Sequence, residues 1–179
     1  MSEYSIAFGP IPSRRLGRSI GINNIPPKIC SYGCIYCQIG RAIKMDDQRR
    51  EYYSAEEVVQ AVREKVEKSL QAGEKIDYLT FVPDGESTLD IHLGEEIRQL
   101  KDLGIPLAII TNSSTMDRED VREELMNLDL VSVKVDSVIE PVWRKINKPH
   151  KGIHLDKVLE GLQIFAGQYK GKLITETML

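Results

Sequence analysis

The alternation of short apolar runs with amphipathic stretches constrains the fold of this chain more than any other feature. The apolar runs predict strands at 18–25, 77–82, 106–111, 130–136 and 173–179. Apolar residues at helical spacing predict helices from Ser54 to Gly73, around 89–103, around 117–128 and along 155–165. Strand–helix alternation of this kind gives right-handed βαβ units and a parallel sheet. We therefore expect an α/β fold with helices packed on the sheet.

The first predicted helix has the clearest boundary signal. Ser54 and Glu57 form a capping-box pattern, in which each side chain bonds the backbone of the other residue. The core face of this helix is predicted at Val58, Val62, Val66 and Leu70.

Length and composition limit the function classes. The chain of 179 residues is long enough for one domain with a sizeable core. It carries no apolar run of the roughly 20 residues that a membrane-spanning helix needs, and its amino terminus has no signal-peptide pattern. Three clustered cysteines do not suit a disulfide framework. We expect a cytoplasmic protein with reduced thiols, without a membrane partner.

Charge is unevenly distributed along the chain. The net charge is −3, which argues against a general nucleic-acid binder. Residues 1–50 are nevertheless basic, with cations at Arg14, Arg15, Arg18, Lys28, Arg41, Lys44, Arg49 and Arg50. Two interpretations stay open: these side chains face phosphate or carboxylate groups, or they form a solvated rim.

All three cysteines lie in "CSYGCIYC", residues 30–37, as Cys30, Cys34 and Cys37. This segment follows the first predicted strand, and ligands of parallel α/β proteins gather at the carboxyl ends of strands. Thiolates select zinc, copper or iron–sulfur clusters. Three thiolates leave one iron of a four-iron cluster free for an outside ligand. Structural zinc would need a fourth ligand, and the only histidines are distant in sequence: His92, His150 and His154. Three inert buried cysteines are the remaining alternative.

"CSYGCIYC", with Tyr36 before the third cysteine, resembles the signature of the radical S-adenosylmethionine (radical SAM) superfamily. The resemblance implies that Cys30, Cys34 and Cys37 hold three irons of a 4Fe–4S cluster. The amino and carboxylate groups of S-adenosylmethionine would then bind the fourth iron. Electron transfer from the reduced cluster would cleave the cofactor to methionine and a 5′-deoxyadenosyl radical, which abstracts a substrate hydrogen.

Two further strand ends fit this resemblance. After the second predicted strand, "PDGESTL" (83–89) carries Gly85 and Glu86 at the place where residues of superfamily members bind the methionine amino group. The match is partial, because Asp84 precedes the glycine, and an ordinary turn with a helix cap is the alternative. Asn112 follows the third predicted strand, where superfamily members often carry a Thr-Asn pair near the cofactor.

Lys134 and Asp136 end the fourth predicted strand. Residues two apart in a strand share one face. Two charged side chains inside a barrel are costly unless they contact a ligand or pair with each other. By the resemblance, Lys134 would bind the methionine carboxylate and Asp136 the ribose hydroxyls. The alternative is a mutual ion pair. Trp143 and His150 are placed in a long loop after this strand, as lid, substrate or packing residues.

The stretches "GPIPSRRLGRSIGIN" (9–23) and "KICSYGCIYCQIGR" (28–41) are similar to iron–sulfur oxidoreductases related to the wyosine-forming tRNA-modifying enzymes. An RNA substrate would use Arg14, Arg15, Arg18 and Arg41 as phosphate contacts. Against it stand the negative net charge and the lack of a recognisable RNA-binding module.

The superfamily core is a (βα)6 partial barrel, whereas the last predicted strand here is the fifth. We therefore expect a single radical SAM core domain over residues 1–179, C-terminally incomplete, whose open fifth-strand edge favours association.

The leading hypothesis is a radical SAM enzyme that uses a 4Fe–4S cluster and S-adenosylmethionine. Its reductant would be an external flavodoxin- or ferredoxin-like electron donor. The second hypothesis is a non-catalytic iron–sulfur protein that transfers electrons or depends on a partner. A zinc-stabilised binding module is the third.

Overall fold

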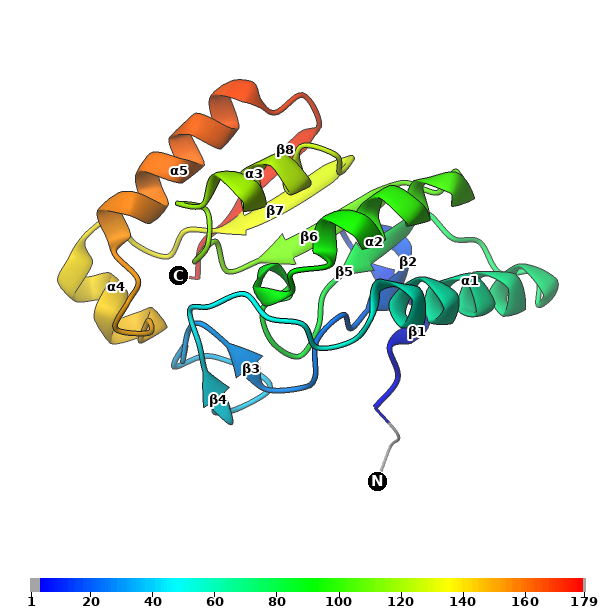
Figure 1. The fold of residues 1–179 in the computed structure, drawn as a ribbon, viewed down its shortest axis with the longest axis horizontal. Coiled ribbons are helices and arrows are strands. Elements are labelled where there is room, and N and C mark those ends of the chain that lie inside the picture. Colours follow the sequence, from blue (N-terminus) through cyan, green and yellow to red (C-terminus); the bar gives the residue numbers. More distant parts are fainter. Residues whose placement is uncertain (1–3, 179) are drawn as a thin grey trace.

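The computed structural model describes residues 4–178, which form one six-stranded sheet, a small two-stranded ribbon and covering helices (Figure 1). The strands are β1 (Ala7–Ser13), β2 (Gly17–Ile22), β3 (Ile29–Cys30), β4 (Lys44–Met45), β5 (Tyr78–Phe81), β6 (Leu107–Thr111), β7 (Leu130–Lys134) and β8 (Lys172–Glu176). The α-helices are α1 (Ala55–Gln71), α2 (Leu93–Leu100), α3 (Glu119–Leu125), α4 (Glu140–Asn147) and α5 (Leu155–Gln168). Two 3₁₀ turns, η1 (Ser87–Leu89) and η2 (Lys101–Leu103), flank α2.

The sheet order is β1-β2-β5-β6-β7-β8, and every pair from β2 to β8 is parallel. This confirms the predicted α/β architecture. The exception is β1, which pairs antiparallel with β2 as a hairpin that the sequence pattern did not predict. β1 contains Pro10 and Pro12, and proline lacks the N–H that a central strand donates, so this segment is suited to an edge position.

The main core lies between the sheet and the four helices α1, α2, α3 and α5 (Figure 1). Strand side chains such as Phe81, Ile109 and Val131 are fully buried against Val62 of α1 and Phe165 of α5 in one cluster. The capping box of α1 is present as predicted. Leu70 was wrongly predicted as a core residue: it is 57% exposed, because the buried stripe of α1 ends at Val66 and Ser69.

The turn of the β1–β2 hairpin folds over the opposite face of the sheet. Leu16 packs against Ala108 and Leu130 at the start of β6 and β7. Arg15 forms an ion pair with Glu176 of β8, which also accepts a hydrogen bond from the Ser132 hydroxyl at 2.7 Å. The hairpin turn thus covers this face of the sheet near the amino-terminal ends of β6 and β7.

Three predicted boundaries differ from the structure. The strand predicted at 18–25 ends at Ile22, and the helix predicted at 89–103 is divided into α2 and η2 behind a separate η1 turn. The last strand occupies Lys172–Glu176 rather than 173–179, and residue 179 lies outside the described residues.

The long loop predicted after the fourth strand contains a helix, α4, with Trp143 inside it. Pro141 occupies the first turn of α4, a position where its missing N–H costs nothing. Figure 1 shows α4 beside the amino-terminal end of α5, and Trp143 of α4 packs in one cluster with Leu155 and Val158 of α5. None of the helices in residues 4–178 is long and apolar enough to cross a membrane.

Candidate cluster and cofactor site

The cysteine segment begins at the last residue of β3 and continues into the loop toward β4, and this loop is attached to the end of α4. The backbone N–H of Gly33 donates to the Asn147 carbonyl at 3.0 Å, and that of Ile35 to the Ile146 carbonyl at 2.9 Å. The last carbonyls of a helix lack partners within the helix. The loop amides supply these partners, so α4 holds the cysteine loop in place.

The three thiols differ in their surroundings. Cys30 and Cys34 are partly buried against a small second core that contains Tyr32 and Trp143, whose rings meet edge to face at 5.8 Å. Cys37 is exposed, and all three cysteines are free. Burial, followed by the charge of Glu86, raises the pKa of the Cys30 thiol to about 12. Burial also raises the pKa of Cys34. A metal that binds these sulfurs would have to displace their protons.

Two adjoining cavities border the loop. One of about 50 Å³ has Cys30, Cys37 and Gly85 in its wall, and one of about 480 Å³ has Cys34, Cys37, Arg41 and Lys148. Gly33, Cys37, Gly40 and Ala42 line both. Within the described part of the chain, no three Cys, His, Asp or Glu side chains converge on one point as ligands of a single ion would. Three thiols around open space, with small neighbours, fit a group of several irons.

Gly85 brings the end of β5 against the start of this loop. A Cβ atom at Gly85 would lie 2.1 Å from the carbonyl oxygen of Ile29, so a side chain has no room there. The N–H of the next residue, Glu86, donates to that same carbonyl at 3.1 Å. The N–H of Lys28 donates in turn to the Asp84 carbonyl at 2.6 Å. The predicted Gly85–Glu86 corner therefore lies directly beside Cys30.

The Glu86 carboxylate is turned inward and is the centre of this corner. The residue is 1% exposed. Its oxygens accept from the Thr88 hydroxyl at 2.6 Å, from the Thr111 hydroxyl at 2.7 Å and from the Asn112 N–H at 2.7 Å. Burial raises the pKa of Glu86, and these donors oppose the rise. Glu86 thus joins the end of β5 to the end of β6; its direct contact with a methionine amino group stays a prediction.

Asn112 contacts the cysteine loop from the end of β6. Its Nδ2 atom lies 2.9 Å from the Ser31 hydroxyl and 3.4 Å from the Cys30 sulfur. Its Oδ1 atom accepts from the Ser114 N–H at 2.9 Å. The predicted site residue after the third strand therefore lies against the first cysteine.

Tyr36, Lys134 and Asp136 meet on the other side of the loop. The Tyr36 hydroxyl donates to the Asp136 carboxylate, and the Lys134 ammonium lies 4.9 Å from the centre of the Tyr36 ring. Burial opposes ionisation of Asp136, but hydrogen bonds from Tyr36, from the Met178 N–H and from Asn147 outweigh it and lower its pKa. No ion pair between Lys134 and Asp136 is present in the described residues; the cation lies over Tyr36 instead.

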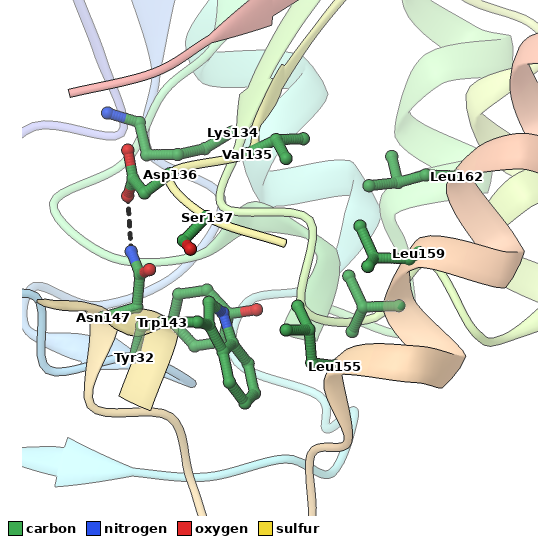
Figure 2. A pocket seen from close by; sticks show the side chains of 11 residues that line it. Tyr32, Lys134, Val135, Asp136, Ser137, Trp143, Asn147, Leu155, Leu159 and Leu162 are labelled. Atoms are coloured by element: carbon green, nitrogen blue, oxygen red, sulfur yellow. Dashed lines mark hydrogen bonds between the residues drawn. The ribbon is translucent and has the colours of Figure 1, made fainter. Parts of the chain in front are cut away.

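Asn147, at the end of α4, is a site residue that sequence reasoning missed. It is 1% exposed, and its Nδ2 atom donates to Asp136 (Figure 2) and lies 3.2 Å from the Tyr36 hydroxyl and 3.4 Å from the Cys34 sulfur. Figure 2 shows Asn147, Asp136 and Lys134 on one side of a small cavity whose other wall is Trp143, Leu155, Leu159 and Leu162. A lone asparagine in a segment predicted as a loop carries no signal for such a role.

Of the other predicted residues, Arg15 and Arg18 lie away from the cysteines. Arg15 is paired with Glu176, and Arg18 contacts Glu74 at 3.3 Å. Both precede or begin β2, at the amino end of the parallel strands. Of the four predicted phosphate contacts, Arg41 alone lines a cavity with cysteines. His150 lies 3.1 Å from Asp47, and Trp143 packs against Tyr32.

Comparison with known proteins agrees with this geometry. The family model described as the radical SAM superfamily matches residues 24–178. A UPF0026 protein of Methanocaldococcus jannaschii is 60% identical over 175 residues, which are 98% of this chain and 54% of that protein. A UPF0026 protein of Synechocystis is 33% identical over 180 residues, 99% of this chain and 66% of that protein. The fold is similar to that of TYW1 with a lysine-pyruvate adduct bound, with a TM-score of 0.67 at 19% identity over 90% of this chain and 55% of that one.

Proposed function

Because the chain belongs to the radical SAM superfamily, we propose that it is the part of a radical SAM enzyme that binds a 4Fe–4S cluster and S-adenosylmethionine. The observation that carries the proposal is the convergence of the cysteine loop with the ends of β5, β6 and β7. The ends of these three strands lie beside the cysteine loop at the carboxyl edge of a parallel sheet, where ligands of such folds bind.

Cys30, Cys34 and Cys37 would hold three irons of the cluster. Bound together, the cluster and S-adenosylmethionine supply a 5′-deoxyadenosyl radical for hydrogen abstraction. The chain contributes position and enclosure: α4 fixes the loop from one side, and the Gly85–Glu86 corner fixes it from the other. Such enclosure keeps water from a reactive intermediate.

The predicted cofactor residues form two groups on opposite sides of the loop. Gly85, Glu86 and Asn112 adjoin Cys30, where the methionine end of the cofactor would lie close to backbone groups. Tyr36, Lys134 and Asp136 adjoin Cys34, where a cation and a carboxylate suit the methionine carboxylate and the ribose hydroxyls. In the cavity beside Lys134 and Asp136 only about 10 Å³ is open, so adenosyl binding there needs side chains of its wall, such as Lys134, to move.

The substrate stays open. An RNA substrate has one favourable observation: Arg41 and Lys148, both exposed, line the 480 Å³ cavity beside Cys34 and Cys37, without a carboxylate in its wall. Phosphate groups would be attracted to such a cavity. If RNA is the substrate, Arg41→Ala should weaken the binding of unfractionated tRNA, whereas Arg14→Ala at the other end of the sheet should not.

A non-catalytic iron–sulfur protein, transferring electrons or dependent on a partner, is the second candidate. The chain spans 54% and 66% of the two curated relatives, so the activity of such a longer protein is itself a proposal for this chain. Asp136→Asn separates the candidates. In an enzyme, the variant should keep the cluster and lose affinity for S-adenosylmethionine. In an electron carrier, the wild-type chain should not bind S-adenosylmethionine, and the variant should behave as the wild type does.

The partners also remain proposals. An external flavodoxin- or ferredoxin-like donor would supply the electron, in the cytoplasm, where thiols stay reduced. In the described sheet, β8 has a neighbour on one side only, and an unpaired edge favours pairing with a further strand. Light scattering at several concentrations would show whether this chain associates through that edge.

The proposed function is tested by anaerobic reconstitution with iron and sulfide, followed by reduction with dithionite in the presence of S-adenosylmethionine. We expect about four irons per chain and formation of 5′-deoxyadenosine. Each of the variants Cys30→Ala, Cys34→Ala and Cys37→Ala should lose both. A chain that binds zinc but no iron under these conditions would contradict the proposal.

A further inference from the structure

Two asparagine side chains point their amide nitrogens at two of the three cysteines. Asn112, after β6, reaches the Cys30 sulfur, and Asn147, at the end of α4, reaches the Cys34 sulfur, each at 3.4 Å. In the part of the chain that the structure describes, no side chain donates to Cys37. The hydrogen bonding of the three thiols is therefore asymmetric.

The orientation of the Asn112 amide is determined by its neighbours. Its Oδ1 atom accepts from the backbone N–H of Ser114 at 2.9 Å, a bond that only the oxygen can make. The nitrogen must then face Ser31 and Cys30. Because Asn112 itself is tied through its backbone N–H to Glu86, this donor is held rigidly.

The orientation of the Asn147 amide follows from Asp136. An ionised carboxylate only accepts hydrogen bonds, so the group that faces Asp136 must be the nitrogen. The same nitrogen lies beside Cys34, while the buried Oδ1 atom has no partner among the described residues. A buried, unpartnered oxygen lowers stability. At this position the nitrogen of the same amide faces three acceptors, which are Asp136, the Tyr36 hydroxyl and the Cys34 sulfur.

We propose that Asn112 and Asn147 are positioning residues that raise the reduction potential of the cluster held by Cys30, Cys34 and Cys37. This inference rests on the proposed function. One-electron reduction makes the cluster and its sulfurs more negative, and N–H donors stabilise negative charge on sulfur. Hydrogen bonds to the sulfurs are among the features that set the potential of an iron–sulfur cluster. The two donors therefore favour the reduced form, and Cys37 is left free of this effect.

Asn112→Ser and Asn147→Leu each remove the amide donor to one cysteine sulfur. Asn112→Ser also removes the contact with Ser31, and Asn147→Leu removes those with Asp136 and Tyr36. A serine at 112 can still accept from the Ser114 N–H but is too short to reach Cys30. A leucine at 147 keeps the branching of asparagine at Cγ, carries no donor, and also removes the unpartnered oxygen. Asn127→Ala is the matched control, because Asn127 is exposed at the end of α3 and contacts only the Glu123 and Glu124 carbonyls.

The test is a dithionite titration of each reconstituted variant, without S-adenosylmethionine, followed by electron paramagnetic resonance. We expect a more negative midpoint potential in each single variant, about additive shifts in the double variant, and no shift in Asn127→Ala. Equal potentials in all proteins with an intact cluster would overturn the inference and leave the proposed function standing. A wild-type chain without a cluster would overturn both.

A second measurement keeps the inference testable if a variant loses its cluster. Wild-type protein labelled with ¹⁵N in the asparagine amides should show nitrogen couplings to the reduced cluster in pulsed electron paramagnetic resonance. The absence of such couplings in a chain that holds the cluster would contradict the inference.

Discussion

The hydroxyl of Tyr36 donates a hydrogen bond to the carboxylate of Asp136, and so joins the cysteine loop to the end of β7. The Lys134 ammonium lies over the same aromatic ring. The contact connects a residue of the cluster motif with two residues that sequence reasoning assigned separately to the cofactor. It makes these three side chains one group rather than three independent contacts.

We predict that Tyr36→Phe lowers the free energy of unfolding by about 1 kcal/mol, because it removes one hydrogen bond but keeps the ring beneath Lys134. Asp136→Ala should cost more, ~2–3 kcal/mol, since it leaves the donors of both Tyr36 and Asn147 without an acceptor. Urea unfolding of the two single variants and the double variant gives the interaction free energy between Tyr36 and Asp136. Additive costs would show that the hydrogen bond contributes nothing to the fold.

Glu86 is predicted to stabilise the chain through its inward-facing carboxylate. Glu86→Gln should lower the free energy of unfolding by about 1–3 kcal/mol, because one acceptor oxygen becomes a donor that faces other donors. Glu67→Gln, on the exposed face of α1, is the control and should change little. Equal stability of both variants in urea would show that the carboxylate does not hold β5 and β6 together.

Two glycine substitutions should have opposite effects. Gly85→Ala forces a Cβ atom against the Ile29 carbonyl and should cost about 1–3 kcal/mol, with less iron retained on reconstitution. Gly167→Ala lies in α5 with open space around it and should stabilise the chain by about 0.4–1 kcal/mol. Thermal unfolding measures both, and a tolerated alanine at 85 would mean that the loop and the corner are less closely packed than described.

Glu96 makes stability depend on pH. It is fully buried in α2, beside the carboxylate of Asp90. Burial, followed by the charge of Asp90, raises the pKa of Glu96 from 4.5 to about 10. A carboxyl whose pKa is higher in the folded chain contributes stability that is complete below its unfolded pKa and is lost as pH rises toward the folded pKa.

The wild-type chain should therefore lose stability relative to Glu96→Gln as the pH rises between about 6 and 9. The measurement is the difference in urea midpoints between the two proteins across that range. Glu95→Gln, one residue away on the same helix, serves as control. A difference that does not change with pH would contradict a protonated Glu96.

Sequence patterns predicted the parallel sheet and its covering helices because burial imposes a period on apolar residues. They missed β1, since the prolines at 10 and 12 disguise an edge strand as a loop. They also missed α4, whose apolar residues Val142 and Trp143 do not form a long helical stripe.

The cysteines and the residues at strand ends were recognisable because motif spacing and topology place them at one edge. Asn147 was not, since its role depends on how α4 meets the cysteine loop, a relationship set by tertiary packing. The same holds for Glu86: a motif names the residue, but the donors around it turn the carboxylate inward.

The most direct test of the central proposal is electron paramagnetic resonance of the reconstituted, reduced chain with and without S-adenosylmethionine. We predict the signal of a reduced 4Fe–4S cluster that changes shape when the cofactor is added, because the iron without a cysteine ligand would bind it. A cluster signal that is the same with and without S-adenosylmethionine would contradict cofactor binding at that iron and favour an electron-transfer protein.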